Sequence, residues 1–226
     1  MNILVACEES QRVTEEFRKL GHNAFSCDII DCSGGHPEWH IKTDVLPLLN
    51  GYCGFNTCNG DWHYLNCKWD MIIAFPPCTH LAVSGARHFE KKRADGRQFD
   101  GINFFCQFLD LECEKVVIEN PVGIISGTYV LEYFPELARK YKLPRPYTQK
   151  IQPYEFGDPF KKTTCLWIKG LPKLKPTNIV EPQLVQYYAS DGRVVTFSVD
   201  YITNTKDRAR IRSKTYPGIA KAMAEQ

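Results

Sequence analysis

Two short segments of the chain carry the side chains that are best suited to chemistry. Cys78 closes the segment Phe75-Pro76-Pro77-Cys78, which follows an apolar run. Because proline cannot continue a central strand, the strand ends there and the thiol stands on a rigid turn, in a fixed geometry that suits a nucleophile. Glu119 ends the next such run and precedes Asn120-Pro121. A carboxylic acid beside a thiol can hydrogen-bond a ring nitrogen and make the ring more electrophilic.

The elements that must position these residues begin with a β-α-β unit. Residues 3–6 predict a buried strand, residues 10–20 a helix ended by Gly21, and residues 24–28 a second strand. Further strands are expected at 71–75, 115–119 and 165–168, with helices at 101–111, 129–141 and 219–225. The segment 87–98 is highly charged and predicts a mobile loop. Together these elements predict an α/β fold with a Rossmann-like sheet and flanking helices.

Two β-hairpins are predicted as small insertions in that fold. Asn59-Gly60 marks a hairpin turn within residues 52–67, and Asp191-Gly192 marks a second one near 186–197. The first insertion also gathers Cys53, Cys58, His63 and Cys67, whose side chains could bind zinc. Their spacing lacks paired Cys-x-x-Cys knuckles. The hairpin explains the segment without a metal, so we expect none.

The strand ends supply candidate ligands for a cofactor. In open parallel sheets, ligands bind beyond the carboxyl ends of the strands, where this sequence places Glu8, Asp28, Asp44, Cys78 and Glu119. An acid that ends the second strand commonly binds ribose hydroxyls, so Asp28 indicates a nucleoside-containing cofactor. The alternative is that Asp28 caps a helix, and that Cys78, one of ten cysteines, is a buried packing residue.

Composition and charge limit the class of protein. The chain has 226 residues, of which 43% are hydrophobic and 24% charged, as in an ordinary globular protein. No apolar run approaches the roughly 18 residues of a membrane span, and the start lacks the features of a signal peptide, so a cytoplasmic location is expected. The net charge is −6 over residues 1–119 and +8 over 120–226. The basic half suits a phosphate-bearing partner, although a solvated surface explains it equally well.

The segments Phe75-Pro76-Pro77-Cys78 and Ile118-Glu119-Asn120-Pro121, in this strand order, resemble the DNA cytosine-5 methyltransferases, most of all their short phage-type members. The resemblance is good over residues 1–126 and loose over 150–226. It implies an S-adenosylmethionine-dependent methyltransferase sheet and a cytosine in DNA as the target. Cys78 would attack carbon 6 of the ring, and Glu119 would contact ring nitrogen 3. A phage origin would place the protein in the cytoplasm of a bacterial host cell.

The resemblance also implies the binding residues. The first motif of the family is glycine-rich, whereas residues 6–11 here contain no glycine. S-adenosylmethionine would contact Ala6, Cys7, Glu8, Asp28, Ile29, Asp44, Val45 and Pro76. The loop after Cys78 would close over the target base, and basic residues would hold DNA. The DNA-binding residues expected are Ser84, Lys91, Lys92, Arg93, Lys161, Lys162, Arg193, Arg208, Arg210 and Arg212.

The length predicts an unusual division of the chain. We expect a catalytic and cofactor-binding domain at 1–170, a reduced substrate-recognition region at 171–212, and a C-terminal helix at 213–226 that returns to the catalytic domain. Because sequence-specific recognition needs several side chains in a groove, so small a region predicts a short target sequence or a smaller substrate. The alternatives are the same chemistry on RNA or a free cytidine nucleotide, or a degenerate protein that binds nucleic acid without turnover. No protein partner is predicted.

Overall fold

A seven-stranded sheet forms the centre of the protein. The structure, a computed structural model, describes residues 1–188, 191–198 and 213–226. The strand order is β3-β2-β1-β6-β7-β9-β8. The strands are β1 (Asn2–Ala6), β2 (Asn23–Asp28), β3 (His40–Lys42), β6 (Met71–Ala74), β7 (Lys115–Pro121), β8 (Gln149–Ile151) and β9 (Thr164–Lys169).

The sheet is mainly parallel, as the Rossmann-like prediction requires. The pairs β3-β2, β2-β1, β1-β6 and β6-β7 are parallel, and only β9 runs antiparallel to its neighbours. The chain moves outward from β1 to β3 and then returns to the other side of β1 with β6. In sheets of this kind, ligands bind beyond the carboxyl ends of the strands at the point of such a reversal, which here lies between β1 and β6. The predicted α/β, Rossmann-like fold class is confirmed.

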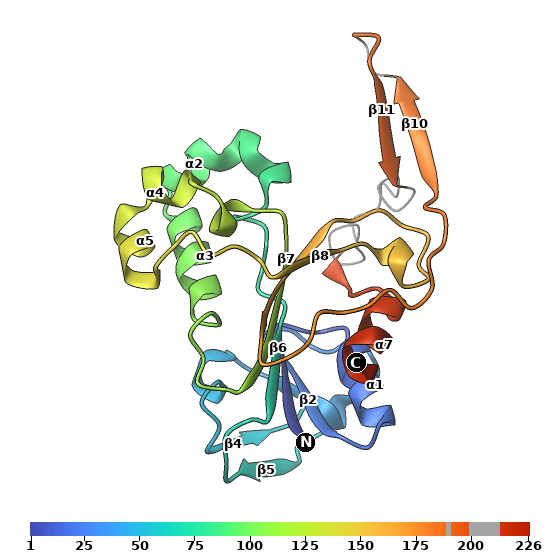
Figure 1. Cartoon of the computed structure of the whole chain (residues 1–226). Coiled ribbons are helices and arrows are strands. Elements are labelled where there is room, and N and C mark those ends of the chain that lie inside the picture. The colour runs from blue at the N-terminus through green and yellow to red at the C-terminus, as the bar shows by residue number, and fades with distance from the viewer. Residues whose placement is uncertain (189–190, 199–212) are drawn as a thin grey trace.

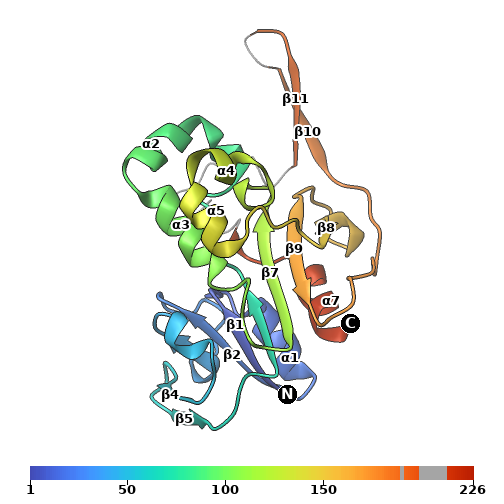
Figure 2. The same ribbon diagram turned by 60° about the vertical axis from the view of Figure 1, so that its left-hand side comes forward.

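Apolar side chains of the strands point alternately to the two faces of the sheet and pack into two separate hydrophobic cores. Ile3 and Val5 of β1 pack on one face with α1 (Arg12–Lys19) and α7 (Pro217–Glu225). Leu4 and Ala6 pack on the other face with α3 (Arg97–Cys106), α4 (Tyr129–Tyr133) and α5 (Pro135–Tyr141). Both faces are therefore covered, which explains the continuous apolar run of β1. Figures 1 and 2 show the helices of the two layers on opposite sides of the sheet.

Both hairpins form where the sequence predicts small insertions. The first consists of β4 (Cys53–Asn56) and β5 (Trp62–Leu65), and Gly60 takes the positive φ of 94° that its turn requires. The second consists of β10 (Leu184–Tyr188) and β11 (Val194–Ser198). Figure 1 shows the second hairpin extending from the body of the protein, with the first at the opposite end of the sheet.

The structure differs from the sequence prediction in three segments. Residues 87–98 are not a loop: the 3-10 helix η3 (Val83–His88) and α2 (Phe89–Ala94) lead directly into α3. They are ordered because Phe89 and Lys92 are buried. The helix expected over 101–111 runs from Arg97 to Cys106 instead. The helix expected over 129–141 is divided into α4 and α5, since Pro135 starts a new helix.

Within the described residues, no helix is both long and apolar enough to cross a membrane.

Candidate functional site

The turn that carries Cys78 lies at the carboxyl end of β6. β6 ends at Ala74, beside Ala6 of β1 and Ile118 of β7. Pro76 is buried and Pro77 exposed, and Cys78 is partly buried. The carbonyl of Cys78 accepts hydrogen bonds from the amides of Leu81 and Ala82, both at 2.9 Å. The double proline and the tight turn therefore fix Cys78 just beyond the end of β6, which lies between β1 and β7.

Glu119 lies one strand away, inside the ladder of β7. It pairs with Leu166 of β9, which runs antiparallel. Burial raises the pKa of the Glu119 carboxyl, and this effect is opposed by the charge of Lys162 and by a hydrogen bond from Thr164. A carboxyl group with a raised pKa keeps its proton at higher pH and can then donate a hydrogen bond. The strand expected at 165–168 is confirmed as β9, whose antiparallel direction the sequence did not indicate. Thr164 at its start and Lys162 just before it are the polar neighbours of Glu119.

The two candidate catalytic segments are joined by hydrogen bonds. The Asn120 side-chain amide donates to the carbonyl of Pro76 at 2.8 Å, and Asn120 is buried. Farther along, the amide of Val83 donates to Val122 at 3.0 Å, and the amide of Ile124 donates to Leu81 at 3.1 Å. The loops after Cys78 and after Glu119 therefore form one structure. Asn120 was not singled out as a functional residue, although its place between Glu119 and Pro121 was visible.

Glu8 has a structural role that the sequence did not reveal. Its side chain is 3% exposed. One carboxylate oxygen accepts a hydrogen bond from the amide of Val13 at 2.7 Å, and the other accepts from the amide and hydroxyl of Thr14 at 3.3 and 2.7 Å. The two amides belong to the first turn of α1, where backbone N–H groups have no partner within the helix itself. The Glu8 carboxylate is thus occupied by donors of the first turn of α1, and its contact with a cofactor stays a prediction.

We expect Glu8→Ala to lower the free energy of unfolding by about 1–3 kcal/mol, because it leaves buried donors unsatisfied.

Burial also raises the pKa of Glu8 to about 7. The folded state then holds the proton more tightly than the unfolded state, so this group lowers stability as the pH rises from its ordinary value towards 7. Urea unfolding at pH 5 and 8 should show Glu8→Gln gaining stability relative to the natural protein at pH 8. An unchanged difference between the two proteins would contradict this assignment.

Besides Glu8, three acidic side chains lie at or just beyond the carboxyl ends of β1, β2 and β3. They are Glu9, Asp28 and Asp44. Glu9 is 9% exposed, and its Oε1 is a buried oxygen without a hydrogen-bond partner. The pKa of Asp28 is raised by burial, with a smaller contribution from the charge of Glu9. Asp44 is exposed, and its carboxylate accepts a hydrogen bond from the amide of Leu46 at 3.1 Å. The sequence analysis names Glu8 and not Glu9, since adjacent residues in a loop cannot be told apart by type alone.

The predicted apolar contacts of the cofactor fall at the same edge. Ala6 and Val45 are buried, while Ile29 is 73% exposed beside Asp28. The pKa of the Cys7 thiol is raised by burial and by the charges of Asp28, Cys27 and Asp44. Cys7 is therefore close to both aspartates. The structure brings the ends of β1, β2 and β3 together, as the sequence requires.

The glycine-free loop between β1 and α1 adopts the conformation that glycine favours. Cys7 and Gln11 have φ values of 60° and 59°. Gln11 is fully buried, and its side chain both donates to and accepts from the backbone of His36, at 2.8 and 3.1 Å. A Cβ on Gly34 would lie 2.6 Å from the Cβ of Gln11, so the loop after β2 needs glycine there to approach this closely. The side-chain bonds of Gln11 offset its unfavourable backbone conformation.

The four predicted DNA-binding residues after Cys78 do not share one environment. Ser84 and Lys91 are exposed. Lys92 is 8% exposed, and its ammonium donates a hydrogen bond to the carbonyl of Thr79, one residue after Cys78. Arg93 lies over the ring of Tyr133 at 4.1 Å and bonds the Tyr129 hydroxyl. Lys92 therefore holds the loop rather than facing a nucleic acid.

The remaining predicted basic residues are scattered. Lys161 is exposed, whereas Lys162 lies near Glu119 and 5.8 Å from the ring of Tyr216. Arg193, at the end of the second hairpin, forms an exposed ion pair with Asp191 at 2.6 Å. The last three predicted residues, Arg208, Arg210 and Arg212, lie outside the described residues.

Burial separates the cysteines from one another. It raises the pKa of Cys27 and Cys106 to about 12 and that of Cys165 to about 11, so these thiols stay protonated. In the first hairpin, His63 is one of the four residues that could have bound zinc. Its ring packs against the rings of Phe25 and Phe55, with centroid distances of 4.9 and 5.5 Å. No group of three or more His, Cys, Asp or Glu side chains in the described parts of the chain could hold a metal ion.

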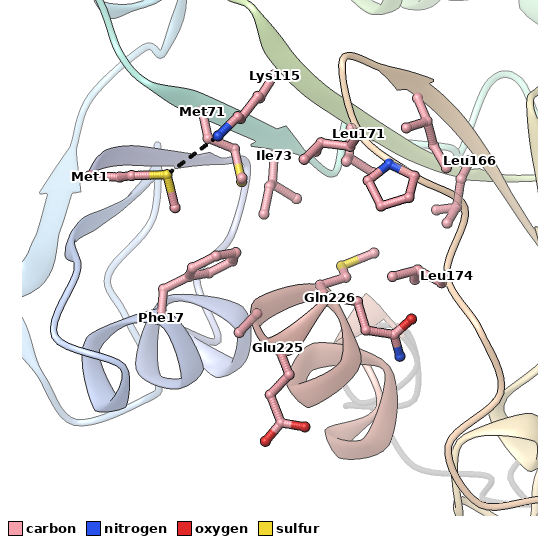
Figure 3. A pocket seen from close by; sticks show the side chains of 15 residues that line it. Met1, Phe17, Met71, Ile73, Lys115, Leu166, Leu171, Leu174, Glu225 and Gln226 are labelled. Atoms are coloured by element: carbon pink, nitrogen blue, oxygen red, sulfur yellow. Dashed lines mark hydrogen bonds between the residues drawn. The ribbon is translucent and has the colours of Figure 1, made fainter.

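An apolar cavity of about 240 Å³ lies away from this site, between the sheet and the pair α1 and α7. It is lined by Met71 at the start of β6, Lys115 at the start of β7, and Phe17 of α1 (Figure 3). The ammonium of Lys115 contacts the sulfur of Met1 at 3.8 Å. Because the starts of parallel strands lie at the edge opposite Cys78 and Glu119, this cavity is separate from the candidate site.

Comparison with known proteins yields one distant structural similarity and no match to a family or to a curated protein. No family model matches the chain, and no curated protein matches it. Among solved structures, the chain is similar to a protein described as a candidate DNA modification methyltransferase encoded within a prophage of E. coli, with 15% identity and a TM-score of 0.46. The match covers 80% of this chain and 52% of that one, so the chain spans about half its length. A likeness this distant assigns no activity.

Proposed function

We propose that the protein is an S-adenosylmethionine-dependent methyltransferase that adds a methyl group to carbon 5 of cytosine in DNA. One observation carries the proposal: the Cys78 turn and the Glu119 strand are joined at neighbouring strand ends through the bond from Asn120 to Pro76. A thiol and a carboxyl group with a raised pKa, both at the crevice of a Rossmann-like sheet, suit covalent attack on an electron-poor ring.

Each catalytic residue has a defined part in the proposed reaction. The Cys78 thiolate forms a bond to carbon 6 of the ring. The π electron pair of the carbon 5–carbon 6 bond shifts to the carbon 4–carbon 5 bond, and that of the carbon 4–nitrogen 3 bond moves onto nitrogen 3, where the Glu119 carboxyl stabilises the charge by donating a hydrogen bond. Carbon 5 then bonds to the methyl group, whose former bond leaves its electron pair on the sulfur of the donor, and afterwards carbon 5 loses its proton to a base. The bond between sulfur and carbon 6 then breaks, and the thiolate is restored.

The residues at the ends of β1, β2 and β3 fit the cofactor. When bound, S-adenosylmethionine supplies an electrophilic methyl group on a sulfonium. The buried Oε1 of Glu9 lacks a partner, and Asp28 lies near it. These acids could accept hydrogen bonds from the ribose hydroxyls or the ammonium group, and the exposed Ile29 could cover the adenine. Ala6, Cys7, Asp44, Val45 and Pro76 remain the other proposed contacts, with Glu9 in place of the Glu8 side chain.

The experiment that tests this function supplies labelled S-adenosylmethionine with four substrates in parallel: duplex DNA, single-stranded DNA, RNA and a deoxycytidine nucleotide. We expect label on carbon 5 of cytosine in DNA. Label on RNA or on the free nucleotide alone would keep the chemistry and change the substrate. Absence of transfer to all four, from protein shown by circular dichroism to be folded, would leave only a nucleic-acid-binding role.

A further inference from the structure

A second cavity lies directly beside the candidate catalytic segments. It measures about 590 Å³ and lies between the loop after Cys78 and the loop after Glu119. Its lining includes apolar side chains, an aromatic hydroxyl, two guanidinium groups and one carboxylate, which belongs to Glu90. The other residues that matter for the argument are Val83, Phe89, Ile124, Tyr129, Arg87 and Arg93. Apolar walls with a few convergent polar groups, in a volume of this order, are typical of small-molecule and nucleotide sites.

The cavity is close to Cys78 along the chain and in space. The amide of Ala82 lies 2.9 Å from the Cys78 carbonyl oxygen, and the next residue, Val83, lines the cavity. On the other side, Gly123 lines it, and this residue forms a bridge with Ala82. The cavity therefore begins one residue beyond the hydrogen-bonded turn that carries Cys78.

The chemistry of the lining fits a nucleotide. The rings of Phe89 and Tyr129 lie 5.2 Å apart, and Tyr129 is fixed by a hydrogen bond to Gln98 at 2.9 Å. Base–aromatic contacts tolerate any base, since every base has a π face. Arg87 is exposed, and within the part of the chain that the structure describes, neither Arg87 nor Arg93 forms an ion pair with a carboxylate. Arg93 bonds the Tyr129 hydroxyl and lies over the Tyr133 ring, and the Nε of Arg87 donates to His88 at 2.9 Å. The remaining guanidinium N–H groups of Arg87 are therefore the ones proposed to bind a phosphate.

We propose that this cavity binds the nucleotide next to the target cytosine, so that the substrate is a DNA strand rather than a free nucleotide. The base would lie against Phe89 and Tyr129, and its phosphate would bind Arg87. This inference rests on the proposed function, because the target cytosine is taken to lie between Cys78 and Glu119. It assigns part of the recognition to the catalytic domain itself, which suits a chain with so short a recognition region.

The test measures how strongly single-stranded oligonucleotides bind, since no base pair then has to be broken. Each strand carries one cytosine, and the nucleotide on its 5′ or its 3′ side is either intact or abasic. Fluorescence anisotropy without cofactor gives the dissociation constant. We expect the abasic change on one side to weaken binding about tenfold or more, as loss of one stacked base does. Deoxycytidine monophosphate should bind more weakly still.

Gly127→Leu provides a variant that places a side chain at the cavity lining. Gly127 lines the cavity with an extended backbone, and a Cβ built there lies no closer than 4.0 Å to other atoms. This variant should bind intact and abasic strands equally, as weakly as the natural protein binds the abasic one. Arg87→Ala should weaken binding of the intact strand. Arg139→Ala, an exposed arginine on α5 away from the cavity, should not.

A second measurement separates the failure of this inference from the failure of the proposed function. Strands with 5-fluorocytosine and S-adenosylmethionine should form a covalent adduct. If the natural protein forms the adduct but binds intact and abasic strands equally, or if Gly127→Leu retains the difference, the neighbouring-nucleotide site is overturned and the proposed function stands. If no strand forms an adduct, the proposed function fails. No measurable binding of the intact strand would overturn the neighbouring-nucleotide site as well.

Discussion

Replacing Cys78 by alanine is expected to abolish covalent capture of 5-fluorocytosine DNA and to lower methyl transfer at least about 10⁴-fold. The reason is that the proposed reaction begins with a bond from the Cys78 sulfur to carbon 6. Fluorine at carbon 5 cannot leave as a proton does, so the natural protein stays attached to the DNA. The adduct is seen as a shifted band in a denaturing gel, and peptide mass spectrometry locates it.

The matched control is Cys58→Ala. Cys58 is exposed and lies in the turn of the first hairpin, so its thiol is at least as accessible as that of Cys78. Its adduct should form as in the natural protein. Cys78→Ala should bind the same strand without capturing it, because the loop is held by backbone bonds and by Lys92. An adduct that survives in Cys78→Ala would identify another residue as the nucleophile.

Glu119→Gln is expected to lower the rate of methyl transfer about 10²- to 10⁴-fold, the usual contribution of a positioned acid or base. The amide keeps the shape of the side chain and one donor, but it cannot exchange a proton. Single-turnover rates measured across pH should lose the dependence that titration of Glu119 contributes. Glu114→Gln is the control, since Glu114 is exposed and lies just before the same strand.

The same substitution should make the protein more stable. Burial raises the pKa of Glu119 in the folded state. The natural protein therefore loses stability as the pH rises from the ordinary carboxyl value through the raised one, and Glu119→Gln removes this loss. Chemical denaturation at pH 8 should show a higher free energy of unfolding for Glu119→Gln, whereas the two proteins should differ little at pH 4. A variant that is both slower and less stable at pH 8 would indicate a structural role.

Much of the fold could be predicted because its signals are local. The apolar run of β1, the helical spacing before Gly21 and the Asn59-Gly60 turn each depend on a few adjacent residues. Helix α2 could not be predicted in the same way. Its residues 89–94 are mostly charged, and it is ordered because Phe89 enters the core and Lys92 reaches the Thr79 carbonyl, contacts that join distant parts of the chain.

The candidate site, like the fold, could be predicted from the sequence only where its signals are local. The sequence by itself determined that Cys78 follows one buried strand and that Glu119 lies near the end of the next, because proline ends the first strand and an apolar run marks the second. The direction of each side chain was decided only in three dimensions. Glu8 caps α1 while Glu9 keeps an unpartnered buried oxygen, although the two residues are identical in type and adjacent.

Residue types and spacing determined the kind of fold and the two reactive groups, since each depends on the chain's own local preferences. The tertiary structure alone decided their surroundings. The antiparallel β9 brings Thr164 and Lys162 to Glu119, Asn120 binds the Cys78 turn, and a cavity opens between the two loops. The physical reason is that pKa values, buried hydrogen bonds and cavities arise from atoms that are far apart in the sequence and meet only when the chain has packed.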